Sequence, residues 1–199
     1  RHYSLPPLFS LSPSAACHAN PPPMSTFTIL LGGDLAPTPR LMGQIAGTRV
    51  IAADSGMAHA AALGVTPELW LGDFDSADPE LFDRFTAVER KSYPVDKDMT
   101  DGELAIAEAV RLGASSFILA GAFGGPRADH AFLHLTAAVS VAETGFDVLA
   151  TDGRQEARAV LHAVNHYDWP VGTLFSVLPF SDLTGLTISG AKWPLGDVD

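Results

Sequence analysis

Short hydrophobic runs alternate with stretches of helical periodicity between Thr26 and about residue 150. The runs predict buried strands at residues 27–31, 50–53, 69–71, 117–120 and 146–150. The periodic stretches predict helices at residues 37–45, 57–63, 79–85, 100–112 and 131–143. Alternating strands and helices are typical of an α/β fold, in which helices cover both faces of a mostly parallel sheet. We therefore expect a three-layer α/β domain over residues 24–150.

One of these helices has a sequence-defined start. Thr100 and Glu103 have the spacing of a capping box, in which each side chain bonds the backbone N–H of the other residue. Leu104, Ala107 and Val110 then form an apolar stripe. The pattern predicts that the helix begins at Thr100 and packs against the sheet.

The pattern changes after about Thr151. Short β-rich runs at residues 159–164, 173–178 and 183–188 are bounded by Gly, Pro, Asn or Asp, which predicts a small antiparallel β domain. The strands are too few for a closed sandwich. Residues 151–199 are therefore interpreted as an incomplete, sandwich-like β domain.

The first 23 residues differ from the rest in composition. They contain no acidic residue and six prolines, and the chain starts with Arg1. A secretory signal is one interpretation, but the apolar stretch around Leu8 to Leu11 is too short and broken for it. We expect residues 1–23 to be a disordered or non-native extension, with Met24 as the natural start.

Charge and hydrophobicity exclude some classes of partner. The formal net charge is -11, which disfavours a nucleic-acid backbone or an anionic membrane as partner. The longest apolar runs have the length of strands, so no membrane span is expected. Cys17 is the one cysteine of the chain, so an internal disulfide is impossible and a reducing cytoplasm is the expected location.

Polar clusters follow four of the predicted strands. They occupy residues 32–34, 54–56, 72–76 and 121–130. In open parallel sheets, ligands bind beyond the carboxyl ends of the strands. The sequence therefore predicts one site at that edge of the sheet.

The cluster at residues 72–76 carries the clearest chemistry. Asp73 and Asp75 are two residues apart, so in an extended segment both side chains point the same way. Carboxylates with open positions suit Mg²⁺, which prefers oxygen ligands and keeps waters or phosphates. A turn in which Asp73, Ser76 or Asp78 caps the next helix is the alternative, and both interpretations can hold together.

A second acidic segment lies at residues 96–101. Asp98 suits a helix start, where carboxylates are favoured, whereas Asp101 can point back to the strand ends from the first turn. Lys97 either neutralises a phosphate or pairs with a neighbouring carboxylate.

The segment at residues 121–130 is a glycine-rich loop that leads into a helix. Backbone N–H groups at such a helix start can bind phosphate, and Arg127 adds a forked donor. His130 and His134 have zinc-ligand spacing, but no third soft ligand is evident. A loop that only makes a turn is the plain alternative.

Taken in order, these blocks resemble the thiamine pyrophosphokinase (thiamine diphosphokinase) family. The matching segments are residues 53–56, 71–76, 97–101, 124–130 and 189–195. The resemblance extends from Phe27 to Leu195, and five ordered blocks are more specific than any one of them. Pro126 is an extra residue before Arg127, and His134 stands where the family commonly has Asn. The family also continues with a further strand pair.

The resemblance implies a homodimer with active sites at the subunit interface and transfer of pyrophosphate from ATP to thiamine, releasing AMP. It implies Mg²⁺ bound by Asp73, Asp75 and Asp101, and a catalytic set that adds Asp98. Trp193 would stack on the thiamine pyrimidine. The full set of implied binding residues is Asp54, Ser55, Gly56, Ser76, Lys97, Thr100, Gly124, Gly125, Arg127, Asp129 and Trp193.

Other functions remain open at this stage. A pyrophosphokinase acting on a hydroxymethylpterin would use similar acidic motifs. A nucleotide-sugar transferase would use Asp73-Phe74-Asp75 but gives the other blocks no role. A thiamine- or nucleotide-binding protein without activity is the non-enzymatic alternative.

Overall fold

The computed structural model describes residues 25–74, 78–93, 99–161 and 164–198. The contacts divide the chain into two compact units, and the division follows Leu161. The boundary expected after residue 150 falls inside strand β6 instead. The first unit extends further because a seventh strand, β7, still pairs with β6.

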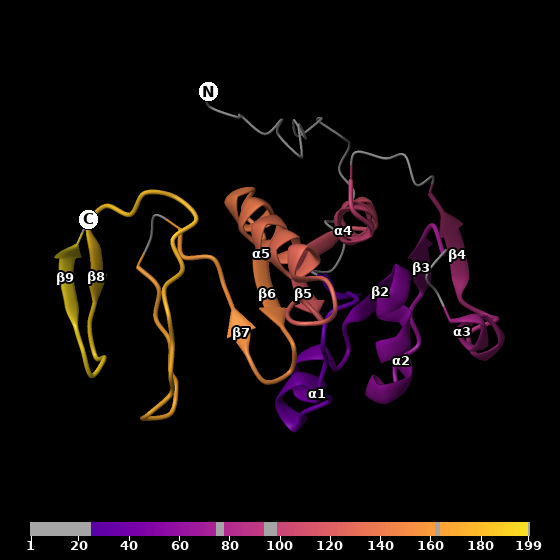
Figure 1. Cartoon of the computed structure of the whole chain (residues 1–199), viewed down its shortest axis with the longest axis horizontal. Helices are drawn as coiled ribbons and strands as arrows, with labels where there is room; N and C mark the ends of the chain where they lie inside the picture. The colour runs from indigo at the N-terminus through magenta and orange to yellow at the C-terminus, as the bar shows by residue number, and fades with distance from the viewer. Residues whose placement is uncertain (1–24, 75–77, 94–98, 162–163, 199) are drawn as a thin grey trace, which may run out of the picture. The chain divides into compact units, whose positions relative to one another are not determined.

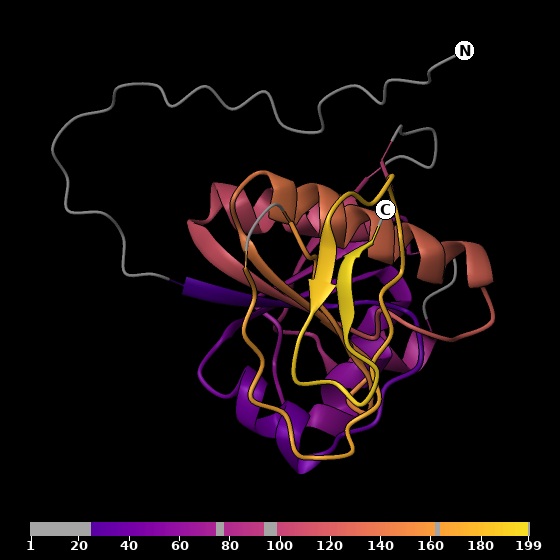
Figure 2. The same cartoon turned by 90° about the vertical axis from the view of Figure 1, so that its left-hand side faces the viewer.

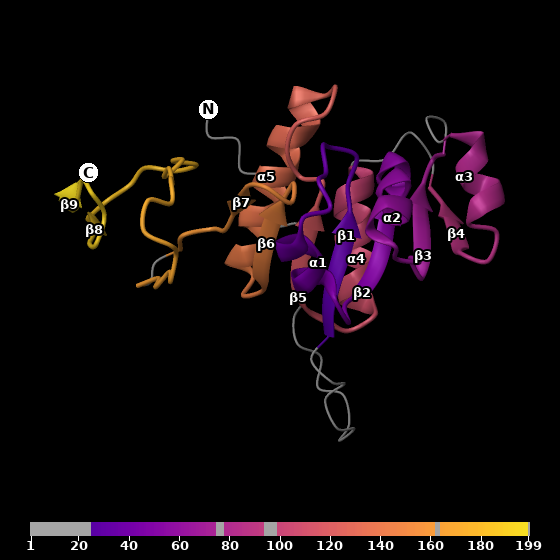
Figure 3. The same ribbon diagram turned by 90° about the horizontal axis from the view of Figure 1, so that it is seen from below.

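The first unit is built around a seven-stranded sheet with the order β4-β3-β2-β1-β5-β6-β7 (Figures 1 and 3). The strands are β1 (Ser25–Leu30), β2 (Arg49–Ala53), β3 (Leu69–Gly72), β4 (Glu89–Ser92), β5 (Ala114–Ala120), β6 (Asp147–Thr151) and β7 (Glu156–Ala157). All neighbouring pairs from β4 to β6 are parallel, and β7 is antiparallel to β6. The predicted α/β class is confirmed.

Helices cover both faces of this sheet. They are α1 (Pro39–Ile45), the 3₁₀ helix η1 (Asp54–Met57), α2 (Ala58–Leu63), α3 (Pro79–Arg84), α4 (Asp101–Arg111) and α5 (Ala128–Glu143). In Figure 1, α4 and α5 lie above the strands and α1, α2 and α3 lie below them; Figure 2 shows the same layers from the side. The first unit therefore has the expected three layers.

Strand residues alternate between two apolar clusters, one on each face. In β1, Phe27 and Ile29 belong to the cluster under α4 and α5, whereas Leu30 belongs to the cluster on the side of α1 and α2. All three are completely buried. A strand buried on both faces reads as a continuous hydrophobic run, which is why the sequence pattern located β1, β2, β3, β5 and β6.

The predicted capping box of α4 is confirmed. The Glu103 amide donates to Thr100 Oγ1 at 3.2 Å, and the Thr100 amide donates to Glu103 Oε2 at 2.7 Å. Helix α3 is capped by Asp78, whose carboxylate accepts from the Glu80 amide at 3.0 Å. Both helices therefore start where side chains satisfy the exposed N–H groups of the first turn.

Strand β4 has no counterpart among the predicted elements. Its sequence, Glu89 to Ser92, is polar and has no apolar alternation, and three of its four residues are exposed. It is the edge strand of the sheet and pairs with β3 through its backbone. Charged side chains are common on edge strands because they hinder pairing with other chains.

In the second unit, β8 (Leu186–Ile188) and β9 (Leu195–Val198) form an antiparallel hairpin. The strand expected at residues 183–188 is thus partly correct. The strands expected at 159–164 and 173–178 are wrong, since the described residues of both segments are irregular. An apolar run alone does not make a strand, because the backbone N–H and C=O groups of a strand need a paired neighbour.

Within the described chain, no helix combines the length and apolar character that crossing a membrane requires.

Ion pairs to the buried Glu108 link α4 to the edge of the sheet. Glu108 is only 8% exposed, and it accepts from Lys91 of β4 at 3.0 Å and from Arg111 at 2.6 Å. Hydrogen bonds, first from Arg111 and then from Lys91, lower the pKa of the Glu108 carboxyl from its usual 4.5. The charged form of Glu108 therefore stabilises the fold.

This network makes stability depend on pH. A lowered folded-state pKa contributes stability that is fully present above the unfolded pKa of about 4.5 and is lost as pH falls through the folded value. We expect Glu108→Gln to lower the free energy of unfolding by about 1–2 kcal/mol at pH 7, with a smaller loss near pH 3. Urea denaturation at both pH values measures this. Glu143→Gln, at an exposed position of α5, is the matched control; equal losses in both variants would contradict the prediction.

Candidate active site at the carboxyl edge of the sheet

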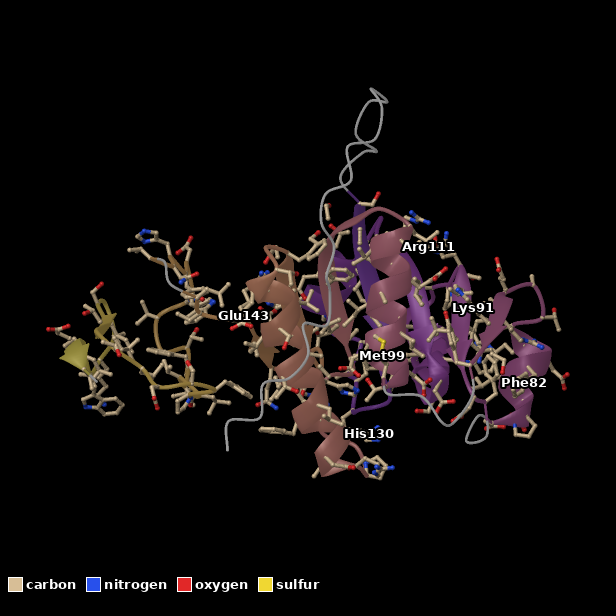
Figure 4. The ribbon with its side chains drawn as sticks, turned by 90° about the horizontal axis from the view of Figure 1, so that it is seen from above. Phe82, Lys91, Met99, Arg111, His130 and Glu143 are labelled. Carbon is tan, nitrogen blue, oxygen red and sulfur yellow. The ribbon has the colours of Figure 1, made fainter. Side chains whose placement is uncertain are left out.

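The parallel sheet brings the predicted polar clusters to one edge. Strands β1, β2, β3 and β5 run in the same direction, so the residues that follow them lie together. Helices α4 and α5 also begin at this edge. In Figure 4, Met99 and His130 mark the starts of these helices, at the opposite end from Arg111 and Glu143. The described polar segments therefore lie together at this edge, as the sequence predicts; that they bind a ligand there stays a prediction.

Asp54 occupies the end of β2 and opens η1. Its neighbour in β2, Ala53, pairs with Leu71, so Asp54 stands beside Gly72 at the end of β3. A Cβ atom on Gly72 would lie 3.1 Å from the Cβ of Asp54, and the φ of Gly72 is +153°. A glycine at this position therefore allows the Asp54 side chain to pack against the end of β3.

The two residues after Asp54 differ in their surroundings. Ser55 is exposed at the edge, whereas Gly56 is buried. A Cβ atom on Gly56 would lie 2.1 Å from the carbonyl oxygen of Leu30. Gly56 thus has a packing role, because it lets η1 approach the backbone of β1. Its predicted contact with a ligand stays a prediction.

Asp73 directly follows β3 and is half-buried. The next residue, Phe74, has a φ of +63°, and its ring packs against Trp70 with the centroids 5.1 Å apart. Asp75 and Ser76 lie outside the described residues. The structure therefore places Asp73 directly after Gly72, the residue that borders Asp54.

Asp101 is the first residue of α4, and Thr100 is its N-cap. The Thr100 hydroxyl is engaged with Glu103 in the capping box, so the observed role of Thr100 is structural. A Cβ atom on Gly102 would lie 3.0 Å from Leu31, which brings the first turn of α4 against the end of β1. The predicted site residues Lys97 and Asp98 lie outside the described residues.

The glycine-rich loop after β5 is joined to the loop after β1. The Gly33 amide donates to the Gly121 carbonyl at 2.9 Å, and the Asp34 amide donates to the Phe123 carbonyl at 2.7 Å. Gly124, with a φ of +63°, leaves room for the Asp34 carboxylate, which would contact any Cβ atom there. Backbone contacts thus hold the two loops side by side between β1 and β5.

Arg127 and Asp129 form a forked ion pair where this loop enters α5. Arg127 Nε donates to Oδ1 of Asp129 at 2.9 Å, and Nη2 donates to Oδ2 at 2.6 Å. The hydrogen bonds from Arg127 lower the pKa of the Asp129 carboxyl to about 2. Both side chains are exposed, as are Gly124 and Gly125, so this end of the loop can meet a ligand.

Two histidines hold the joined loops from opposite faces of the sheet. His59 of α2 bonds the Gly33 carbonyl at 2.8 Å, and His134 of α5 bonds the Ala122 carbonyl at 3.3 Å. Burial lowers the pKa of His134. Sequence reasoning overlooked His59 because a single histidine in an Ala-rich helix carries no motif. It considered His134 as a zinc ligand and as a departure from the Asn that the family commonly has there.

Trp193 belongs to the second unit, where it is 75% exposed and lies 4.6 Å from the Lys192 ammonium. An exposed indole with a neighbouring cation has the surface that a flat ring would need for stacking. Its predicted contact with thiamine stays a prediction.

The donor set suits a hard divalent cation. Asp54 and Asp73 offer oxygen atoms at adjacent strand ends, and Mg²⁺ binds through a few carboxylates with the remaining positions open to phosphate and water. Among the residues that the structure describes, no three His, Cys, Asp or Glu side chains lie close enough to hold a metal ion by themselves. The predicted metal ligands are Asp73, Asp75 and Asp101, of which Asp75 lies outside those residues; Asp98, predicted to line the same site, lies outside them as well.

Comparison with known proteins identifies the first unit. The sequence profile of the thiamin pyrophosphokinase catalytic domain matches residues 46–150. This range includes all four described strands from β2 to β5, both acidic segments and the glycine-rich loop. No curated protein sequence matches the chain.

Solved structures show the same fold. The thiamine pyrophosphokinase of Bacillus subtilis is 26% identical with a TM-score of 0.55, over 64% of this chain and 61% of that one. The enzyme of Geobacillus thermodenitrificans is 26% identical with a TM-score of 0.50, over 63% and 59%. The yeast enzyme, at 11% identity and a TM-score of 0.50 over 65% and 59%, shares the fold alone.

The chain therefore spans about three fifths of the length of the structures it matches. Because the family profile covers more than half of the chain, this protein belongs to the thiamin pyrophosphokinase family.

Proposed function

We propose that this protein transfers the pyrophosphoryl group of ATP to the hydroxyl of thiamine, giving thiamine diphosphate and AMP. The observation that carries the proposal is the match of the family's catalytic domain to residues 46–150. The geometry supports it, since Asp54 and Asp73 stand at neighbouring strand ends of a parallel sheet. Open α/β sheets bind nucleotides at this edge.

In this proposal, Asp73, Asp75 and Asp101 hold Mg²⁺, and Asp54 lines the same site. When bound, the cation neutralises charge on the phosphate oxygens of ATP. A site of net negative charge needs this, because its carboxylates would otherwise repel a polyphosphate.

The loops of the chain bind and orient the phosphates. Gly124 and Gly125 present exposed backbone just before α5, whose first N–H groups favour anions. Arg127 adds a planar cation that suits phosphate oxygens. Its pairing with Asp129 restricts the orientation of the guanidinium and leaves three of its five N–H groups for a ligand.

The reaction itself is an in-line attack. The thiamine hydroxyl oxygen forms a bond to the β-phosphorus of ATP, the bond from that phosphorus to the α,β-bridging oxygen breaks, and AMP leaves. Asp98 is assigned as the base that accepts the hydroxyl proton, and Trp193 as the stacking partner of the pyrimidine. Positioning and charge neutralisation supply most of the catalysis in such transfers.

AMP release from ATP, thiamine and Mg²⁺ tests the proposal directly. We expect Asp73→Asn to lower kcat/KM by about 100-fold or more while the protein stays folded, because it removes a charged oxygen donor from the site. Asp83→Asn, on the exposed side of α3, makes the same charge change and should retain activity. A parallel assay with hydroxymethylpterin separates the two acceptors.

AMP release from the Asp73→Asn variant at the wild-type rate would contradict the role of this carboxylate. Release that depends on hydroxymethylpterin but not on thiamine would replace the proposed acceptor. A wild-type protein that releases no AMP with either acceptor would contradict the proposed reaction.

The Arg127–Asp129 pair gives an independent prediction. In Arg127→Gln, the pKa of Asp129 should rise from about 2 towards its usual 3.8, because the hydrogen bonds from the guanidinium are lost. The KM for ATP should rise about tenfold through loss of a charged phosphate contact. Carbon-detected NMR titration and steady-state kinetics measure the two effects, with Arg154→Gln as an exposed control.

An unchanged KM for ATP in Arg127→Gln, together with the raised pKa of Asp129, would show that the pair only orders the loop. That result would contradict the assigned role of Arg127 in phosphate binding.

A further inference from the structure

The two loops that follow β2 and β3 and carry Asp54 and Asp73, here called the acidic loops, have an unusual backbone. Asp54, with a φ of +43°, and Phe74, with a φ of +63°, are two of the three non-glycine residues of positive φ in the described chain. They lie at the ends of the neighbouring strands β2 and β3. This conformation is unfavourable for residues with a side chain, and most of all for a bulky one. Such strain persists only where surrounding contacts fix it.

One side chain contacts both strained residues. Trp70, in β3, is completely buried. Its Nε1–H donates to the carbonyl oxygen of Asp54 at 2.9 Å. Its ring meets the ring of Phe74 edge-on, with the centroids 5.1 Å apart at 85°. The indole therefore links the loop after β2 to the loop after β3.

The indole is itself held in place. The Phe82 ring lies 4.8 Å from it, and the Arg90 guanidinium lies 5.8 Å from it. Arg90 in turn donates to the Phe82 carbonyl at 2.9 Å, which ties α3 to β4 around the indole. A tryptophan is the one side chain that combines a large ring with an N–H donor at its edge.

We propose that Trp70 is a positioning residue that fixes the backbone of both acidic loops and thereby the placement of the Asp54 and Asp73 carboxylates. The part of this inference that concerns metal binding rests on the proposed function. The part that concerns the loops does not. Loss of the N–H donor frees the Asp54 carbonyl, and loss of the ring frees Phe74 to relax from its strained conformation.

Hydrogen exchange of the metal-free protein tests the loops. Trp70→Phe keeps an aromatic ring and removes the N–H donor. We expect exchange to speed up about tenfold in η1, the factor that corresponds to one buried hydrogen bond, and by less at residues 72–74, where an aromatic ring still meets Phe74. Phe85→Leu is the matched control: Phe85 is buried in the same cluster and has no ring contact with Trp70 or Phe74 among those described. It should leave exchange in both loops unchanged.

Binding of Mn²⁺ in the presence of a non-hydrolysable ATP analogue tests the consequence for the site. Trp70→Phe should weaken Mn²⁺ binding about tenfold, because a small displacement of ligands is costly in a preorganised site. Phe85→Leu should stay within about twofold of wild type. If Trp70→Phe does not fold, Phe74→Leu decides: it should speed exchange at residues 72–74 and leave η1 unchanged.

Three results would overturn the inference. One is wild-type exchange in both loops of Trp70→Phe, and another is equal acceleration in Phe85→Leu. The third, should Phe74→Leu be the deciding variant, is wild-type exchange at residues 72–74. A wild-type protein that binds no Mn²⁺ would instead count against the proposed function, while the exchange data would still decide the role of Trp70 in the loops.

Discussion

The parallel hydrogen-bond ladders of the central sheet are the constraint on which the rest of the structure depends. Because β1 to β6 all run in one direction, the segments after β1, β2, β3 and β5 must meet at one edge. The order of the strands reverses at β1, since β2 to β4 lie on one side of it and β5 to β7 on the other. The joined loops of Gly33 and Gly121 lie at this switch point, and the loops after β2 and β3 lie one and two strands away from it. The glycine-rich loop and the carboxylates thus come from neighbouring positions of a single edge.

Side chains from both helical layers hold this edge. His59 reaches it from α2 and His134 from α5, and each bonds a backbone carbonyl of the joined loops. Trp70, within the sheet, bonds the Asp54 carbonyl and packs its ring against Phe74. A Cβ atom at Gly72 would crowd Asp54, and one at Gly124 would collide with the Asp34 carboxylate. The edge therefore combines close backbone packing with exposed functional groups.

The sequence was sufficient for the elements that bury apolar residues on both faces or carry a defined cap. Strand β1 and the Thr100 capping box of α4 are examples. It was not sufficient for β4, whose polar edge residues form a strand only because β3 supplies a ladder. After residue 158 the sequence predicted strands that do not form among the described residues. Apolar β-formers there, such as Val164 and Leu174, are 83% and 94% exposed and belong to no strand. Trp70 and His59 escaped prediction because their roles arise from partners distant in the fold. The acidic and glycine-rich segments could be placed at one edge because they come directly after apolar runs that the sequence identifies as strands.

The central claim is that the carboxyl edge binds a divalent cation together with ATP. Paramagnetic broadening of backbone amide signals, in a titration with Mn²⁺ and a non-hydrolysable ATP analogue, tests it most directly. We expect the amides of Asp54, Asp73, Asp101 and the glycine-rich loop to broaden first, because the effect falls steeply with distance from the ion. Mg²⁺ should reverse it by competition. Broadening that begins elsewhere, or none at concentrations that saturate such sites, would contradict the account.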